Sequence, residues 1–219
     1  MPPVPPPILL SLREHVPGDA PDGLSQVTYR IDLGAQHYDV FIRARDLPAQ
    51  PGLEACLPLA LLAGMRLGRP VRVCGPLSAT FLAGVRQVVA RFADGFEEFQ
   101  PIAIDADSTY LAEGPRGPRR AAFFSGGVDS FFTVLKGREQ LTDLIYIHGF
   151  DVRLDDLPRR AAIHQMGHAV AGALGMRFIE VESNLAKVLQ DFGHWAQHGH
   201  GFALAAIARA LTGGIGEVR

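Results

Sequence analysis

Six residues near the middle of the chain have the types and the spacing of a phosphate-binding turn. They read Ser125-Gly-Gly-Val-Asp-Ser130 and follow the apolar run Ala121–Phe124. Two adjacent glycines allow a tight turn with positive φ and leave the backbone N–H groups uncovered by side chains. A helix start adds unpaired N–H donors and a partial positive charge, and the two serines add hydroxyl donors. We therefore predict that this turn holds a phosphate-sized anion.

Asp129 is the acidic residue of this turn, and its charge would repel a phosphate group unless a cation lay between them. A carboxylate oxygen is a hard ligand of the kind that Mg²⁺ prefers. We therefore expect Asp129 to anchor a magnesium ion beside the phosphate. The alternative is a glycine-rich strand-to-helix turn that holds no ligand. The turn differs from a Walker A loop, because no Gly-Lys-Ser/Thr sequence follows it.

The residues after position 120 alternate between short apolar runs and helical patterns. That alternation predicts βαβ units around a parallel sheet, and so an α/β fold. The expected strands cover 121–124, 144–148, 177–181 and 216–219, and the expected helices cover 128–138, 157–174 and 201–212. The expected buried stripe of the helix 157–174 consists of Ala162, Met166, Ala169, Val170, Ala173 and Leu174.

Polar residues and glycines follow three of the expected strands, in the segments Ser125–Asp129, His148–Asp151 and Glu182–Asn184. Ligands of parallel sheets bind beyond the carboxyl ends of the strands, so we expect these segments to converge at one sheet edge. Asn184 contacts a ribose or a substrate in one interpretation and caps a short helix in the other. For Asp155–Asp156 we favour capping of the following helix over metal binding.

The turn resembles the SGGxDS signature of the PP-loop ATP pyrophosphatases, the N-type adenine nucleotide alpha hydrolases. The blocks Tyr146–Val152 and Glu182–Leu185, and the His-Gly-rich start of the last helix, also look like one branch of that superfamily. The resemblance implies an enzyme that cleaves ATP to AMP and pyrophosphate with Mg²⁺. It would adenylate a carboxylate or amide oxygen of a small-molecule substrate, and an amine, ammonia or a sulfur nucleophile would then displace AMP. We favour an AMP-forming ligase, because Cys56 and Cys74 lie outside the expected ATP-binding domain.

The resemblance also assigns roles to individual residues. Ser125 and Asp129 would take part in catalysis, Asp129 would bind the metal, and the end of the strand 144–148 would hold adenine through backbone groups, with Phe150 stacked on the base. The implied ATP-binding set is Phe124, Ser125, Gly126, Gly127, Val128, Asp129, Ser130, His148, Gly149, Phe150 and Asn184. The implied fold is Rossmann-like, with at least five strands.

Two groups of histidines are candidates for chemistry. His194, His198 and His200 precede the last expected helix, and His198 is our candidate for stabilising pyrophosphate or for acid–base work. The alternatives are a three-histidine zinc site, which would make a metal hydrolase, and a glycine-flanked linker with incidental histidines. His164 and His168 have the i,i+4 spacing of shared metal ligands, but we favour surface histidines because the Glu of a zinc protease motif is missing.

The first half of the chain predicts a separate small α+β domain. We expect a Pro-rich arm over 1–24, the α+β domain over 25–112, a linker over 113–120 and the ATP-binding domain over 121–219. The small domain would shape the substrate site or mediate homo-oligomerisation. The linker arginines are expected at a solvated surface, or one of them reaches the ATP phosphates or an acidic substrate; they are Arg116, Arg119 and Arg120.

Composition narrows the function classes further. The chain has 219 residues and a net charge of −2, so nothing indicates a general nucleic-acid surface. No apolar run reaches membrane-spanning length, and we expect a soluble cytoplasmic protein.

The sequence ends inside the fourth expected strand, so we expect an incomplete ATP-binding domain whose strand 121–124 is exposed at the sheet edge. The competing function is a nucleotide-binding or regulatory module without turnover.

Overall fold

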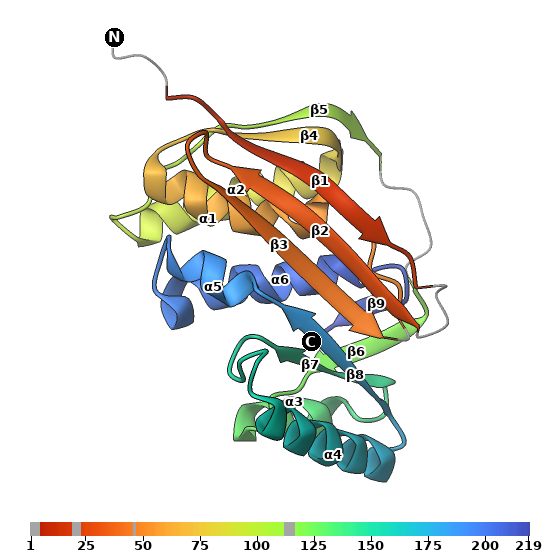
Figure 1. The fold of residues 1–219 in the computed structure, drawn as a ribbon. Helices are drawn as coiled ribbons and strands as arrows, with labels where there is room; N and C mark the ends of the chain where they lie inside the picture. Colours follow the sequence, from red (N-terminus) through yellow and green to blue (C-terminus); the bar gives the residue numbers. More distant parts are fainter. Residues whose placement is uncertain (1–4, 19–22, 46, 112–116) are drawn as a thin grey trace.

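The computed structural model describes residues 5–18, 23–45, 47–111 and 117–219. Within them, nine strands form one sheet in the order β5-β4-β1-β2-β3-β8-β7-β6-β9 (Figure 1). The first half supplies β1 (Ile8–Val16), β2 (Leu24–Asp32), β3 (His37–Arg45), α1 (Leu57–Leu67), β4 (Val71–Ser78), α2 (Ala79–Gly95) and β5 (Ile104–Tyr110). The second half supplies β6 (Arg119–Phe123), α3 (Val128–Gly137), β7 (Asp143–His148), α4 (Leu157–Leu174), β8 (Arg177–Ser183), α5 (Leu185–Gln190), α6 (His200–Ala210) and β9 (Ile215–Val218).

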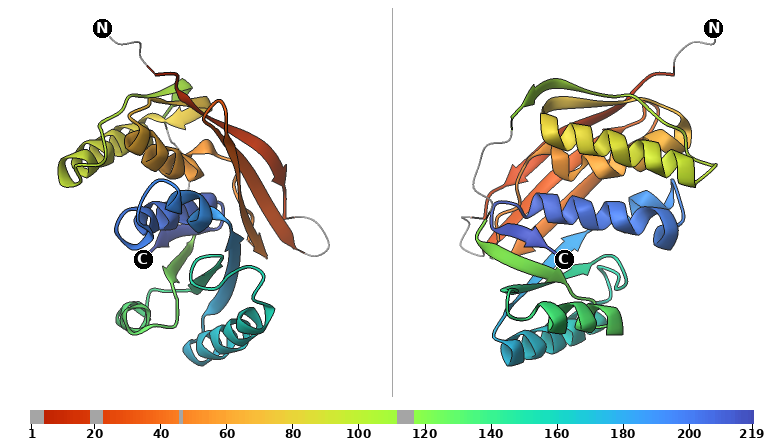
Figure 2. Two further views of the ribbon diagram at one scale, coloured as in Figure 1. Left: turned by 60° about the vertical axis from the view of Figure 1, so that its left-hand side comes forward. Right: turned by 180° about the vertical axis from the view of Figure 1, so that it is seen from behind.

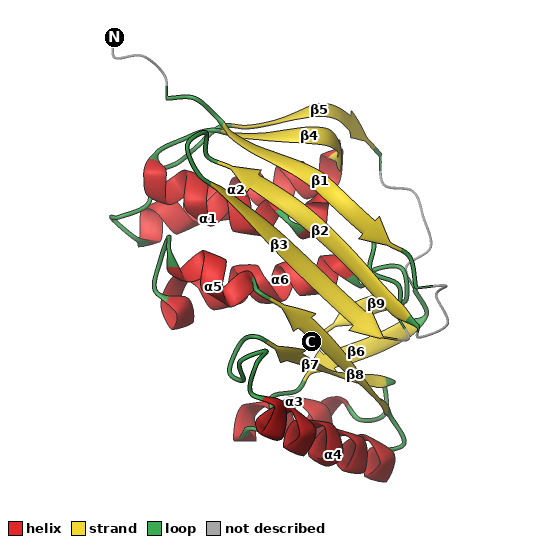
Figure 3. Ribbon diagram, viewed as in Figure 1, coloured by secondary structure: helices red, strands yellow, loops and turns green. Residues whose placement is uncertain are grey.

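The sheet is mixed, and its strand directions divide it into two parts. The neighbours β1–β4, β4–β5, β8–β7, β7–β6 and β6–β9 are parallel, whereas β1–β2, β2–β3 and β3–β8 are antiparallel. The α/β fold class and the parallel order in the second half are therefore as predicted. Figure 3 shows the strands of the first half in front of α1, α2 and α6, with α3 and α4 at the lower end of the molecule.

Two helical layers cover the sheet. The helices α1, α2, α5 and α6 pack together on one side and share the larger core with all nine strands (Figure 2). The helices α3 and α4 lie on the other side, where a smaller core joins them to β6 and β7. In the second half, helices thus cover both faces of the parallel strands, an arrangement compatible with a Rossmann-like fold.

Local sequence explains the hairpin and the first helix. In β2, Val27, Tyr29 and Ile31 are fully buried and alternate with partly exposed residues, as a half-buried strand requires. Pro58 occupies the first turn of α1, where the missing N–H costs no hydrogen bond. Gly68 ends that helix in the left-handed conformation.

Several predicted boundaries were wrong. The segment predicted as an N-terminal arm contains β1, because Ile8 and Leu10 are fully buried and the strand pairs with β4 as well as with β2. The sequence pattern predicts a strand over 99–104, but β5 begins at Ile104. The linker prediction over 113–120 lies partly outside the described residues, and Arg119 and Arg120 belong to β6. The two predicted domains also share one sheet through the β3–β8 pairing.

The fourth strand of the parallel part does form. It is β9, and it pairs with β6, so β6 lies inside the sheet rather than at its edge. In chain order, the parallel strands β8-β7-β6-β9 are the third, second, first and fourth. The order therefore reverses beside β6, and such a reversal is where open α/β sheets bind ligands. No helix of the described residues combines the length and apolar character needed to cross a membrane.

Candidate functional site

The glycine-rich turn lies at the carboxyl end of β6 and leads directly into α3, as predicted. Gly126 adopts a left-handed φ of 82°, and Gly127 is the N-cap residue of α3. A β-carbon on Gly126 would lie 3.1 Å from Cε of Met166 in α4. Glycine therefore suits this position in two ways, because it adopts the positive φ and avoids the close contact with Met166. A β-carbon on Gly127 would meet only Ser125 Oγ, at an ordinary 3.5 Å.

The first-turn N–H groups of α3 are available to a ligand. They have no intrahelical acceptor, and Gly127 at the N-cap position has no side chain that could accept from them. The Ser130 hydroxyl donates to Gly127 O at 2.8 Å, and Ser125 Oγ accepts from Gly127 N at 3.4 Å. The two hydroxyl oxygens lie 3.5 Å apart. Phosphate-type anions suit such a cluster of backbone and hydroxyl donors at a helix start.

The turn is open to solvent. Ser125, Gly127 and Asp129 are exposed, and Val128 keeps 85% of its surface accessible. Two cavities of the described structure, of about 1050 and 560 Å³, are lined by other segments. The larger one lies between α2, α6 and β9. Neither cavity therefore includes the turn, which lies on the surface at the end of β6.

The ends of β7 and β8 approach each other as expected. A β-carbon on Gly149, whose φ is 98°, would lie 1.9 Å from Ser183 O, so only glycine permits this contact. Phe150 packs edge-to-face on Trp195, with ring centroids 4.9 Å apart. The predicted stacking of Phe150 on adenine would have to use the part of the ring that Trp195 leaves accessible.

The side chain of His148 points into the sheet–α4 interface and so serves no adenine contact. It is 1% exposed, and its Nε2 lies 2.9 Å from Glu180 Oε1. Glu180 Oε2 lies 2.6 Å from His164 Nδ1. Burial alone raises the pKa of Glu180, but the hydrogen bonds from His148 and His164 outweigh that effect and lower its pKa to about 2.

Asn184 has a structural role that neither interpretation of the sequence included. Its Nδ2 donates to Asp39 O at 2.9 Å, and its Oδ1 accepts from Phe41 N at 3.0 Å. It occupies the N-cap position of α5, but its side chain does not cap that helix. The amide instead extends the pairing between β3 and β8 by one residue, which engages one Nδ2 hydrogen and one Oδ1 lone pair.

His198 is a core residue rather than a group at the phosphate turn. It lies in a short π-helix, η2 (Trp195–Gly199), and is 7% exposed. Its ring packs edge-to-face on aromatic side chains of α2 and the following loop, with centroids 4.6 Å from Phe96 and 5.0 Å from Phe99. Its Nδ1 accepts a hydrogen bond from His194 N at 3.0 Å.

The prediction of a catalytic His198 was therefore wrong, because η2 belongs to the helical layer of α1, α2 and α6, whereas α3 lies on the other face of the sheet. The three-histidine zinc site does not form either. Among the described residues, the His, Cys, Asp and Glu side chains that come close enough to share an ion are His164, His168 and Glu180.

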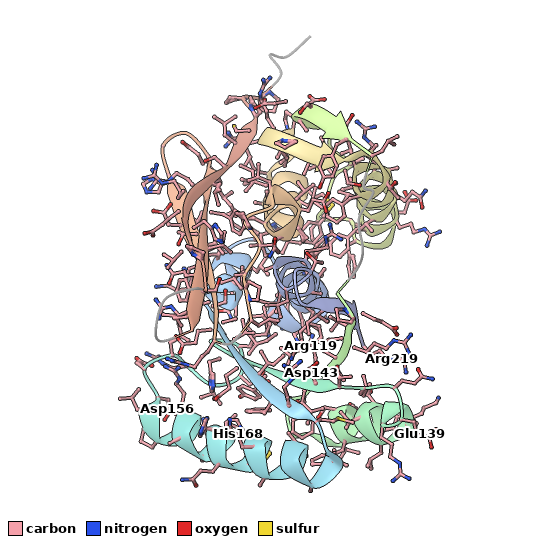
Figure 4. The ribbon with its side chains drawn as sticks, turned by 90° about the vertical axis from the view of Figure 1, so that its right-hand side faces the viewer. Arg119, Glu139, Asp143, Asp156, His168 and Arg219 are labelled. Carbon is pink, nitrogen blue, oxygen red and sulfur yellow. The ribbon has the colours of Figure 1, made fainter. Side chains whose placement is uncertain are left out.

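The described linker arginines hold strands together instead of reaching a ligand. Arg119 Nε donates to Asp143 Oδ2 at 2.8 Å (Figure 4). Asp143 is fully buried and also pairs with Arg177. Nε of Arg120 lies 3.4 Å from Oε2 of Glu217 in β9. The expected solvated surface was wrong for Arg119, which keeps 16% of its side chain exposed. Arg116 lies outside the described residues.

The acidic residues after β7 behave as predicted. Asp156 is the N-cap residue of α4, and its Oδ1 accepts a hydrogen bond from Arg159 N at 3.2 Å. Asp155 pairs with Arg153 on the surface. Cys56 is buried, which raises the pKa of its thiol well above the ordinary value, so it cannot act as a thiolate nucleophile.

The sequence reasoning missed a polar interface between α4 and β8. Arg160, His164 and His168 recur every four residues on α4, opposite Glu182, Glu180 and Phe178 of β8. Four helical residues advance about 6.0 Å and two strand residues advance about 6.6 Å, so the two periods nearly match. The available signal was the alternation Phe178, Glu180, Glu182, which puts two carboxylates on the strand face that the preceding helix covers.

Comparisons with known proteins place the chain in no family. A scan against protein-family models, a search of curated proteins and a search of solved structures each find no significant match.

Proposed function

We propose that the protein binds ATP at the turn Ser125–Ser130 and cleaves it to AMP and pyrophosphate. The observation that carries the proposal is the placement of an uncapped, glycine-rich helix start at the point where the parallel strand order reverses. The outer phosphates would lie on the first-turn N–H groups of α3 and on the hydroxyls of Ser125 and Ser130. The exposed carboxylate of Asp129 has the oxygen chemistry that a magnesium ion needs.

The proposed reaction adenylates a carboxylate or amide oxygen of a small-molecule substrate, and an amine, ammonia or a sulfur nucleophile then displaces AMP. An AMP-forming ligase is the version that this chain supports best. Both cysteines lie in the first half of the chain, and the buried thiol of Cys56 is unsuited to carrying sulfur. The resemblance of the turn to the PP-loop signature supports the same reaction class.

Binding is tested by substitution of Gly127, the glycine with free space around it. Gly127→Val introduces no backbone strain, because φ is −82° and ψ is 168°. Its side chain would cover the N–H groups that a phosphate must approach. We expect at least tenfold weaker binding of magnesium ATP in calorimetry. Gly172→Val, at a helical glycine of α4 with nothing within 4 Å, is the control for folding. Equal affinity of the wild type and Gly127→Val would contradict the proposal.

The position of cleavage is a separate prediction. A turn that grips the outer phosphates holds them as the leaving group, so the products should be AMP and pyrophosphate rather than ADP and phosphate. Chromatography of ATP incubated with the protein, Mg²⁺ and a mixture of small carboxylic acids and amines would identify them. ADP as the main product would refute this cleavage, and binding without ATP–pyrophosphate exchange would favour a nucleotide-binding module.

A further inference from the structure

The interface between α4 and β8 contains a cluster of metal-ligand side chains that is separate from the phosphate turn. His164 and His168 lie one turn apart on α4, and Glu180 projects toward them from β8. Candidate ligand atoms of the three side chains all lie within 4.8 Å of one another. The rings of His164 and His168 are 4.4 Å apart between centroids.

We propose that His164, His168 and Glu180 bind a first-row divalent transition metal ion such as Zn²⁺. Two imidazoles and one carboxylate form a donor set that such ions use, whereas Mg²⁺ and Ca²⁺ prefer oxygen ligands alone. Ligand atoms about 2.1 Å from a tetrahedral ion are roughly 3.4 Å apart. The ligand atoms of the three side chains, now within 4.8 Å of one another, therefore need only small side-chain rotations to coordinate an ion. Two of these side chains, His164 and His168, are exposed.

A buried partner already orients the carboxylate. His148 contacts Glu180 Oε1 at 2.9 Å, while the other oxygen faces His164. Metal ligands in proteins are commonly fixed by such a second layer of hydrogen bonds. Nδ1 of His148 has no hydrogen-bond partner in the described structure, so Nε2 is the one nitrogen of this ring that is engaged. His148 thus serves the cluster as a positioning residue.

The cluster opens onto a cavity, which leaves a coordination position for a further ligand. The cavity has a volume of about 560 Å³, and His164, His168 and Glu180 all line it. Arg43, Arg45 and Arg160 line it as well. Three protein ligands and an open position are typical of catalytic zinc sites rather than structural ones. Glu182 also lines the cavity and pairs with Arg43 and Arg160, so the charges beside the cluster are largely balanced and water is the fourth ligand that we expect.

His168→Ala is the sharpest test of the site. His164 and His148 hydrogen-bond to Glu180, whereas His168 makes ring contacts with His164 and Phe178. Among the described residues, its removal therefore deletes a ligand and leaves the Glu180 hydrogen bonds intact. His37→Ala, at an exposed histidine of β3, is the matched control. Zn²⁺ is the probe, since a site of this kind binds it at least as tightly as Fe²⁺.

We expect the untagged wild type to bind one Zn²⁺ per chain in calorimetry and to give the visible absorption of tetrahedral Co²⁺. His168→Ala and Glu180→Gln should each weaken Zn²⁺ binding at least tenfold, and His37→Ala should bind as the wild type does. Circular dichroism would verify that each variant folds, and His168 is exposed enough to replace safely. A wild type without stoichiometric Zn²⁺, equal affinity of His168→Ala, or an equal loss in His37→Ala would overturn the proposal.

Discussion

Asp129 is the residue on which the proposed chemistry depends most directly. It occupies the first turn of α3, is exposed, and has its main-chain carbonyl bonded to Thr133 Oγ1 at 3.0 Å. At such a position a carboxylate gains about 0.3–1 kcal/mol from the helix dipole whether or not a ligand is present. Its presence alone therefore does not distinguish a metal anchor from an ordinary first-turn residue.

The substitution Asp129→Asn separates these two roles. If Asp129 is a magnesium ligand, ATP binding should weaken mainly when Mg²⁺ is present, and turnover should fall by about a hundredfold, on the order of one lost charge-stabilising contact. If it is only a first-turn residue, binding should stay unchanged or improve slightly, because a negative charge near phosphate is gone. ATP affinities measured with Mg²⁺ and with EDTA decide between them. An equal loss under both conditions would remove Asp129 from the mechanism.

Residue types were easier to predict than residue partners. Gly126 was predictable, because a positive φ is a local property of a turn between a strand and a helix. His198 and Asn184 were misread, since their surroundings come from Phe96 and from the backbone of β3, far away in the sequence. The residue type predicts that a buried polar side chain will form a hydrogen bond, but the neighbouring sequence does not predict which group is its partner.

At the scale of elements, α4 shows how far periodicity can predict packing. Its bounds were predicted in full, because Asp156, a proline in the first turn and Gly175 mark both ends. Its buried stripe was predicted less well. Ala162, Ala169 and Ala173 are exposed, whereas the buried residues are Gly167 and Ala171. A prediction from apolar residues alone missed that the face of α4 toward β8 carries polar side chains and comes close to the strand at Gly167.

Gly167 fixes how closely α4 approaches the sheet. A β-carbon there would lie 2.1 to 2.4 Å from ring atoms of Phe178 in β8, far inside contact distance. We expect Gly167→Ala to destabilise the protein by about 1–3 kcal/mol through overpacking. Gly172→Ala in the same helix meets nothing within 4 Å and should stabilise by about 0.5–1 kcal/mol. Urea unfolding of both variants measures the difference, and equal midpoints would contradict this account of the interface.

At the scale of the whole molecule, the join between the two halves was the least predictable feature. Each half contains a recognisable pattern of strands and helices, which suggested two domains with a linker between them. The structure instead pairs Ile42 of β3 with Ser183 of β8 and packs α1 against α6. The apolar pattern of β3 predicts a strand but not which strand lies beside it. The backbone N–H and C=O groups of β3 could form hydrogen bonds with many other strand edges. Contacts across more than a hundred residues leave no local signature.

A continuous sheet and a shared core predict that both halves unfold together. Trp195, the single tryptophan of the chain, reports on the second half, while Leu10 is fully buried in β1 of the first half. We expect Leu10→Ala to cost about 2–5 kcal/mol and to lower the urea midpoints of Trp195 fluorescence and far-UV circular dichroism by the same amount. Leu12→Ala, at a leucine of the same strand that is 42% exposed, should change both midpoints far less. If Leu10→Ala left the Trp195 transition where it is in the wild type, the halves would be independent domains despite the pairing of β3 with β8.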